Sequence, residues 1–196
     1  MNYLAHMALA PDNDNARIGN YLGDFIKGLE DVLRCQYSQA VVDGIMLHRR
    51  IDQFTDSATE FNLMCAVFRS KFGRVAPIIV DVMLDHLLIR HWDEFMSESF
   101  ETFLSKAYRS LHMIVNDNNY PEKCRKFTRR LIERDAFNVY SSMEGIHEIL
   151  CSINRRLKNR TRLPEASPVI INNFIELDTL FIQFFPKLKC FSEENS

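Results

Sequence analysis

The stretch VAPIIVDVMLDHLLIRHW, residues 75–92, determines how the rest of the chain is interpreted. It is apolar on almost every side of a helix, which predicts one buried helix. Within it, Asp81 and Asp85 are four residues apart, so their carboxylates stack on one face. Two ionised carboxylates in a buried helix are costly unless cations or hydrogen-bond donors compensate them. A bound metal ion is the compensation that the sequence best supports.

The composition is that of a globular protein built from helices. Of the 196 residues, 46% are hydrophobic and 26% are charged, as is typical of soluble chains. Six Gly and six Pro are too few for an all-β chain, which needs a turn about every ten residues. No stretch shows a convincing strand-like alternation of polar and apolar residues. We therefore expect an all-α fold, a helical bundle in which residues 1–196 form a single domain.

Apolar residues at helical spacing predict helices along the whole chain. Gly19, Gly23 and Gly28 lie in the first long helix, where they weaken the helix prediction and favour the close approach of another backbone. Thr55 and Asp56 predict a break between two helices, with Asp56 as an N-cap. The expected helices span residues 16–29, 38–54, 58–72, 75–92, 99–114, 122–134, 138–157 and 169–188.

The cysteines indicate a reducing compartment. They are five in number and widely spaced, and no C-x-x-C pair occurs. This pattern excludes a zinc knuckle and a thioredoxin-like motif and favours a cytoplasmic location. The N-terminus lacks the basic region and apolar run of a signal peptide. No run of ~18 apolar residues predicts a membrane span, so we expect no membrane association.

Charge is distributed unevenly along the chain, although the formal net charge is only −2. Residues 1–60 hold nine Asp and Glu against five Lys and Arg, whereas residues 122–162 hold five against eleven. The contrast predicts an acidic site near the start and an anion-attracting surface later. Nucleic acid is disfavoured as the partner, because the protein is acidic overall and Phe127 is the one aromatic residue interleaved in the basic segments. An acidic protein fits the same charge pattern.

Residues with the chemistry of metal ligands recur in these apolar helices. Imidazole and carboxylate groups without a thiolate suit a hard or borderline divalent ion, for which we expect Mn²⁺, with Mg²⁺, Fe²⁺ or Co²⁺ as alternatives. Helix bundles build such sites from side chains that face inward on adjacent helices. Arg49 and Arg50 follow His48 and are candidates for phosphate binding, since a guanidinium matches phosphate oxygens. The candidates for the metal site are Asp24, His48, Asp52, Asp81, Asp85 and His86, with His6 as a further candidate.

A structural role stays open for each of these candidates. A histidine near a chain terminus can simply pack, and a carboxylate can accept a backbone amide. A His–Asp pair four residues apart can form a surface ion pair. The adjacent Asp85 and His86 can be buried against Arg90 or another arginine.

Five segments carry a resemblance to a known family: NYLAH at 2–6, GNYLGDFIKG at 19–28, GIMLHRRIDQFTD at 44–56, DVMLDHLLIRHW at 81–92 and FIQFFPKL at 181–188. They resemble the acyl carrier protein phosphodiesterases, also called acyl carrier protein hydrolases, over essentially the whole chain. The resemblance implies a divergent relative of the HD-domain phosphohydrolases, all-helical enzymes whose His and Asp side chains hold divalent metal. It further implies a Mn²⁺-dependent hydrolase that removes the 4′-phosphopantetheine arm from holo-acyl carrier protein.

The resemblance also implies roles for individual residues. One departure limits the comparison with HD enzymes: the adjacent pair runs Asp85-His86, reversed from the usual His-Asp order, so their ligand map cannot be transferred. The implied roles are metal binding by His48, Asp52, Asp85 and His86, a ligand, base or outer-sphere role for Asp24 and Asp81, a catalytic contribution from His6, and charge stabilisation by Arg49 and Arg50.

The implied partner is holo-acyl carrier protein, a small acidic helical protein. Its docking surface is expected within residues 122–134 and 155–162, where salt would weaken the attraction. Two other functions stay open: hydrolysis of a nucleotide or other small phosphoester, and a non-catalytic module that binds carrier protein. The sequence does not indicate an oligomeric state.

Overall fold

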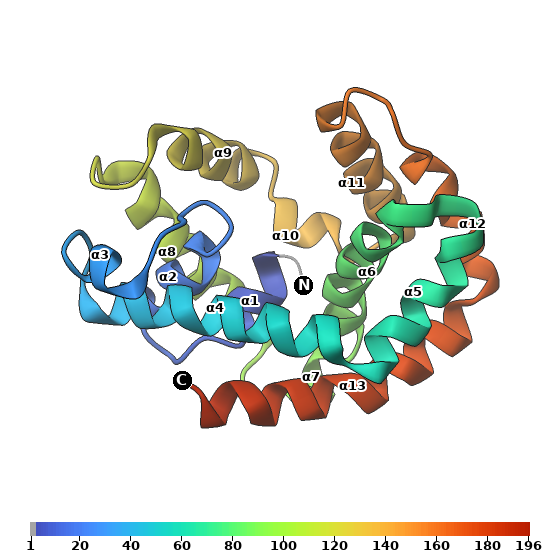
Figure 1. Ribbon diagram of the computed structural model, residues 1–196, viewed down its shortest axis with the longest axis horizontal. Coiled ribbons are helices and arrows are strands. Elements are labelled where there is room, and N and C mark those ends of the chain that lie inside the picture. The colour runs from blue at the N-terminus through green and yellow to red at the C-terminus, as the bar shows by residue number, and fades with distance from the viewer. Residues whose placement is uncertain (1–2) are drawn as a thin grey trace.

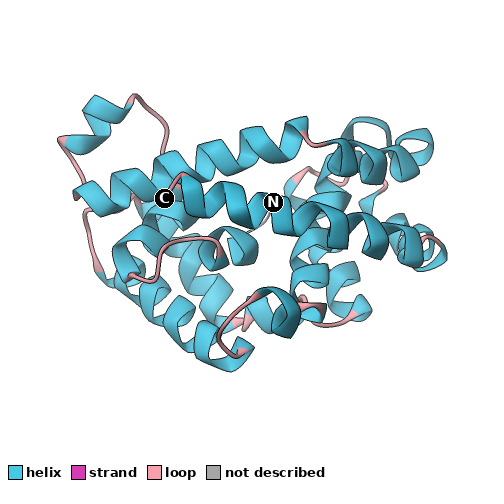
Figure 2. Ribbon diagram, turned by 90° about the horizontal axis from the view of Figure 1, so that it is seen from below, coloured by secondary structure: helices cyan, strands magenta, loops and turns pink. Residues whose placement is uncertain are grey.

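The computed structural model describes residues 3–196, and within them every regular element is a helix (Figures 1 and 2). This confirms the all-α prediction. The elements are α1 (Tyr3–Ala8), α2 (Asp14–Leu22), α3 (Glu30–Arg34), α4 (Gln39–Ser57), α5 (Thr59–Phe72), the 3₁₀ turn η1 (Gly73–Val75), α6 (Ala76–Arg90), α7 (Trp92–Phe95), α8 (Phe100–Asn116), α9 (Glu122–Glu133), α10 (Ala136–Val139), α11 (Met143–Arg156), the 3₁₀ turn η2 (Leu163–Ala166), α12 (Ser167–Asn172) and α13 (Phe174–Glu194).

Helix α6 is buried on all sides, as its sequence predicts. Every residue from Val82 to Leu88 is buried, which covers nearly two full turns of the helix. Pro77 lies in its first turn, where a missing amide hydrogen costs nothing. The helix contacts α1, α5, α11 and α13, so it lies at the centre of the fold. Polar groups on α6 must therefore find partners inside the protein.

Helices α2 and α4 form the most extensive helix pair and approach backbone to backbone. A Cβ atom added to Gly19 would lie 2.1 Å from the carbonyl oxygen of Val41, and one added to Gly44 would lie 2.4 Å from that of Ala16. Glycine is therefore required at both positions. The expectation that Gly19 admits another backbone is confirmed. The contact also places the end of α2 against the middle of α4, where the candidate site lies.

Helix α4 is longer than expected. It continues through Thr55 and Asp56 to Ser57, and α5 begins at Thr59 after Ala58 in an extended conformation. The predicted break is therefore misplaced by about one turn, and Asp56 is not an N-cap. Because the helix continues, His48, Asp52 and Asp56 share one face at intervals of four residues.

The last long helix, α13, packs along α4 and α5 at the lower edge of Figure 1. Its buried face is aromatic and includes Phe181, Phe184 and Phe185. This helix ends at Glu194, beyond the expected end at residue 188, so Pro186 lies inside it. Within residues 3–196 no helix is both long and apolar enough to cross a bilayer. The five cysteines all lie in this part of the chain, and none forms a disulfide.

Candidate metal centre

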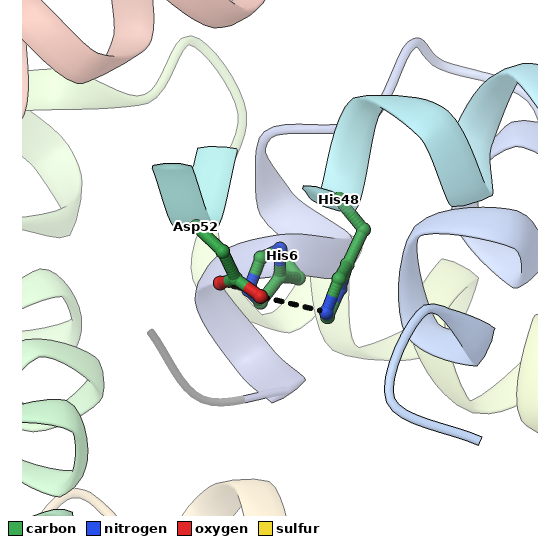
Figure 3. Close-up of side chains that lie close together, drawn as sticks. All are labelled: His6, His48 and Asp52. Atoms are coloured by element: carbon green, nitrogen blue, oxygen red, sulfur yellow. Dashed lines mark hydrogen bonds and ion pairs between the residues drawn. The ribbon is translucent and has the colours of Figure 1, made fainter. Parts of the chain in front are cut away.

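Two histidines and a carboxylate converge where α1 meets α4 (Figure 3). His6 comes from α1, and His48 and Asp52 come from successive turns of α4. The Nε2 atoms of His6 and His48 lie 3.1 and 3.2 Å from the two carboxylate oxygens of Asp52. The imidazole rings are stacked with their centroids 3.8 Å apart. One ligand atom from each residue lies within 4.8 Å of the others, so these three residues could hold one metal ion.

Asn20 on α2 orients both imidazole rings. The Nδ1–H group of His48 donates to the backbone oxygen of Asn20 at 2.7 Å. His6 Nδ1 lies 3.2 Å from the side-chain oxygen of the same residue. A proton on each Nδ1 leaves each Nε2 with its lone pair directed at the other ligand atoms, as metal binding requires. The donor set and its orientation therefore fit a divalent cation.

The electrostatics also favour a cation at this position. Burial lowers the pKa of His48, but hydrogen bonds and charge from Asp24 and Asp52 outweigh burial and raise it to about 9. Burial and the neighbouring His48 lower the pKa of His6 to about 4. Burial alone would raise the pKa of Asp52, yet its two histidine partners hold it well below its usual range. Without a metal ion, His48 therefore carries a proton on Nε2 as well at neutral pH, and a metal ion can replace this proton.

Asp24 joins this cluster from the segment that follows α2. Its carboxylate lies 3.7 Å from His48 Nε2, and its side chain is about half exposed. Burial acts to raise the pKa of Asp24, and the hydrogen bond and charge of His48 more than reverse this effect. Four predicted site residues, His6, Asp24, His48 and Asp52, are therefore brought together. His48 is only 2% exposed, so its pairing with Asp52 is not the surface ion pair that the sequence left open.

An acidic cavity of about 370 Å³ opens beside these residues. Asp81 lines it from α6, and burial raises the pKa of this carboxyl. Asp56 and Arg156 also line it, and the sequence interpretation missed both. The four-residue spacing from His48 would have revealed Asp56 if α4 had been continued past Thr55. No local pattern distinguishes Arg156 from the other arginines of its basic segment. The complete lining is Tyr3, Asp24, Asp52, Asp56, Ile78, Asp81, Val82, Ile153 and Arg156.

Asp85 lies at the start of α1, outside the cluster of His6, His48 and Asp52. It is fully buried, and its two carboxylate oxygens each accept one backbone N–H, from Leu4 and from Ala5, at 3.2 Å. These amides belong to the first turn of α1 and have no partner within the helix. Asp85 thus caps α1 from another helix and holds the turn that carries His6. Burial raises the pKa of Asp85 to about 7.

Three other expected site residues lie away from the cluster, and we leave them out of the ligand set. His86 is one residue beyond Asp85 on α6, so it points about 100° away, and its Nδ1 bonds to the backbone oxygen of Tyr140 at 2.7 Å. Arg49 donates to the backbone oxygens of Gly28 and Ile26. Arg50 donates to that of Asn195. Both arginines follow His48 on α4, so their side chains leave the helix in other directions.

Gly23 gives a test of the site that changes no ligand. A Cβ added there would lie 2.2 Å from Cγ and Cδ2 of the His48 ring, so the ring must move. The backbone of Gly23 is helical, with φ −53°, so alanine itself fits. We expect Gly23→Ala to lower the affinity for Mn²⁺ about 10- to 100-fold, as when an orienting partner is lost. Calorimetric titration with Mn²⁺ measures this, with Asn15→Ala on the exposed face of α2 as a control. Unchanged affinity would show that His48 does not bind the metal.

Comparison with known proteins identifies the family to which the chain belongs. A model of the family described as acyl carrier protein phosphodiesterase matches residues 1–188. Curated acyl carrier protein phosphodiesterases from Serratia proteamaculans, Enterobacter sp. and Pectobacterium atrosepticum are 34%, 33% and 31% identical to the chain. Each alignment covers 96% of this chain and 95% of the relative. No solved structure matches significantly. The full-length match and these relatives show that the chain belongs to the acyl carrier protein phosphodiesterase family.

Proposed function

We propose that this protein hydrolyses the phosphodiester that joins 4′-phosphopantetheine to holo-acyl carrier protein, releasing apo-carrier protein and 4′-phosphopantetheine. The observation that carries the proposal is the convergence of His6, His48 and Asp52 beside an acidic cavity in a chain of this family. Hydrolysis of a phosphodiester needs an activated water and compensation for phosphate charge, which this arrangement suits.

The proposed cofactor is Mn²⁺, held by His6, His48 and Asp52 with Asp24 at the edge of the site. Imidazole and carboxylate ligands suit this ion, and Mg²⁺, Fe²⁺ and Co²⁺ are the alternatives. When bound, such an ion lowers the pKa of a coordinated water and neutralises phosphate charge. An all-helical fold with a His and Asp ligand set also supports a distant relation to the HD-domain phosphohydrolases. The Asp85-His86 pair contributes no ligands to this proposal.

Asp81 is the proposed proton carrier of the cavity. It lines the cavity from α6, and burial gives its carboxyl a raised pKa. A carboxyl group in such surroundings can accept a proton from attacking water and return it to the leaving oxygen. In this proposal Asp24 and Asp56 keep the cavity negatively charged and hydrated.

Arg156 is the proposed phosphate-binding residue, in place of Arg49 and Arg50. It brings a positive charge to a cavity lined by four carboxylates, and its guanidinium lies 5.7 Å from the ring centre of Phe127. That stacking restricts the guanidinium, which also donates a hydrogen bond to the Tyr3 hydroxyl and keeps further donors for a phosphate. We expect Arg156→Ala to lower kcat/KM on holo-carrier protein by about 100-fold, or ~2.7 kcal/mol of transition-state stabilisation. Arg69→Ala, an exposed arginine on α5, is the control and should match the parent. Parental activity of Arg156→Ala would place the phosphate elsewhere.

The proposed partner surface lies on α9 and α11. Arg130, Arg134 and Arg155 line one cleft between these helices, which brings together the two basic segments expected from the sequence. An acidic carrier protein would be attracted to this surface, and salt would weaken the encounter. A cytoplasmic location is part of the proposal and agrees with the unpaired cysteines.

The direct test incubates the protein with holo-acyl carrier protein and Mn²⁺ and follows the carrier by intact-mass spectrometry. We expect loss of the phosphopantetheine mass and no reaction after EDTA treatment. No mass loss with Mn²⁺, Mg²⁺, Fe²⁺ or Co²⁺ would exclude the proposed function. Faster hydrolysis of free nucleotides than of carrier protein would instead favour a small phosphoester as substrate.

A further inference from the structure

A second and larger cleft lies between α9 and α11, which stand on either side of α10 in Figure 1. Its volume is about 1020 Å³, at the upper end of the range of about 300 to 1,000 Å³ typical of small-molecule sites. Its floor is apolar and is formed by Phe127, Leu131, Phe137, Ile149 and Ile153. Charged and polar side chains line the rest of the cleft, among them Arg130, Arg134, Arg155, His147 and Glu148, so the apolar part suits an uncharged segment of a larger ligand.

The cleft adjoins the acidic cavity of the metal centre. Tyr3, Ile153 and Arg156 line both spaces, so these residues form the boundary between them. A ligand that occupies both spaces would pass these three residues, with its phosphate at the metal centre and one substituent in the cleft. A phosphodiester has two substituents, and each must extend from the bound phosphate into space that can accommodate it.

We propose that this cleft binds the pantetheine arm of the substrate, an inference that rests on the proposed function. The arm is long and uncharged, with a dimethyl-substituted carbon, two amides and a terminal thiol. Its methyl and methylene groups match the apolar floor, and Ser152 on α11 offers a hydroxyl to an amide. An uncharged arm offers no ion-pair partner to the exposed Arg130, Arg134 and Arg155. These three arginines can therefore bind the acidic surface of the carrier protein, which would lie outside the cleft.

Ile149 allows the inference to be tested away from the metal centre. It lines the cleft but not the acidic cavity, and it is half-buried on α11. We expect Ile149→Trp to fill part of the floor and to lower kcat/KM on holo-carrier protein about tenfold relative to kcat/KM on bis(p-nitrophenyl) phosphate, a loss of ~1.4 kcal/mol. The matched control is Ile175→Trp, because Ile175 is 84% exposed on α13 and lines neither space. The control should show the parental ratio, and a parental ratio for Ile149→Trp would overturn the inference.

A second measurement tests whether the arm lies in the cleft without any substitution in the cleft floor. It applies even if Ile149→Trp fails to fold. Cys151 lines the cleft, five residues before Arg156 on α11 and therefore about 7.5 Å from it along the helix axis. The parent chain in EDTA is mixed with holo-carrier protein whose arm thiol is activated as a thionitrobenzoate disulfide. The Cys151 thiolate attacks the arm sulfur, the new disulfide forms, and thionitrobenzoate leaves with the electron pair.

Peptide mapping gives the result of this exchange. An adduct on Cys151 that exceeds those on the exposed Cys35 and Cys190 supports the arm in the cleft. Adducts confined to Cys35 and Cys190, or no adduct, overturn it. Failure of the proposed function is a separate outcome, because it is the parent that then fails to convert holo- to apo-carrier protein with any of the four metals.

Discussion

Asp52→Asn is expected to abolish metal binding and to lower kcat/KM on holo-carrier protein by about a thousandfold or more, ~4 kcal/mol of transition-state stabilisation. The reason lies in the geometry of the carboxylate, whose two oxygens face His6 Nε2 and His48 Nε2 separately. An amide can present its oxygen to one imidazole only, and its NH₂ group then faces the other. The negative charge that offsets a divalent cation is lost as well.

The fold should tolerate this substitution. The Asp52 side chain is 42% exposed at the edge of the acidic cavity, and the buried His48 keeps the Asp24 carboxylate at 3.7 Å as a partner for its charge. Elemental analysis measures the bound metal, circular dichroism measures the helix content, and the mass assay measures turnover. Asp43→Asn on the exposed face of the same helix is the matched control and should behave as the parent. An Asp52→Asn protein that retains Mn²⁺ and parental turnover would move the metal to other carboxylates of the cavity.

The proximity of His48 and Asp52, which the sequence predicted, depends on local spacing. His48 and Asp52 are one helical turn apart on α4, and any helix over residues 38–54 brings their side chains together. Asp24 is less local, since its approach to His48 depends on the close contact of α2 with α4 at Gly19 and Gly44. The sequence indicated such a contact through its glycines, but it did not identify the partner helix.

The structure directs Asp85 and His86 away from the cluster, and the sequence could not show this for a physical reason. The polar face of an amphipathic helix shows which side of the helix faces solvent. Helix α6 is apolar on every side, so its sequence does not show how the helix is rotated about its axis. Periodicity therefore predicted that α6 is buried but not the direction in which each polar side chain points. Asp85 faces the start of α1 and His86 faces Tyr140. Arg156 and Asn20 were beyond prediction because their roles depend on helix packing between distant segments.

Asp85 also affects how stability varies with pH. Burial gives the folded protein a pKa of about 7 at this group, above the value of about 3.9 in an unfolded chain. The folded state therefore binds more protons than the unfolded state between these values, and the free energy of unfolding falls as pH rises through this window. Replacing Asp85 removes this dependence. The stability difference between the parent and an Asp85 variant should be larger at pH 5 than at pH 8.

Asp85→Ala is expected to lower the free energy of unfolding by about 3 kcal/mol and to weaken Mn²⁺ binding at the same time. The loss of stability follows because two buried backbone N–H groups, of Leu4 and Ala5, lose their acceptors. The loss of metal affinity follows because those amides hold the helical turn that carries His6. Urea unfolding in EDTA measures the first effect, and Mn²⁺ titration measures the second.

The comparison with His6→Ala distinguishes a cap from a ligand. His6→Ala removes a metal-binding nitrogen but leaves both amides bonded to Asp85, so it should lose Mn²⁺ affinity with a much smaller loss of stability. Asp85→Ala should lose both. If Asp85→Ala lost Mn²⁺ affinity at parental stability, Asp85 would be a ligand after all. If it lost stability at parental affinity, the position of His6 would not depend on the cap. Only the combined loss agrees with a carboxylate that acts on the metal centre through α1.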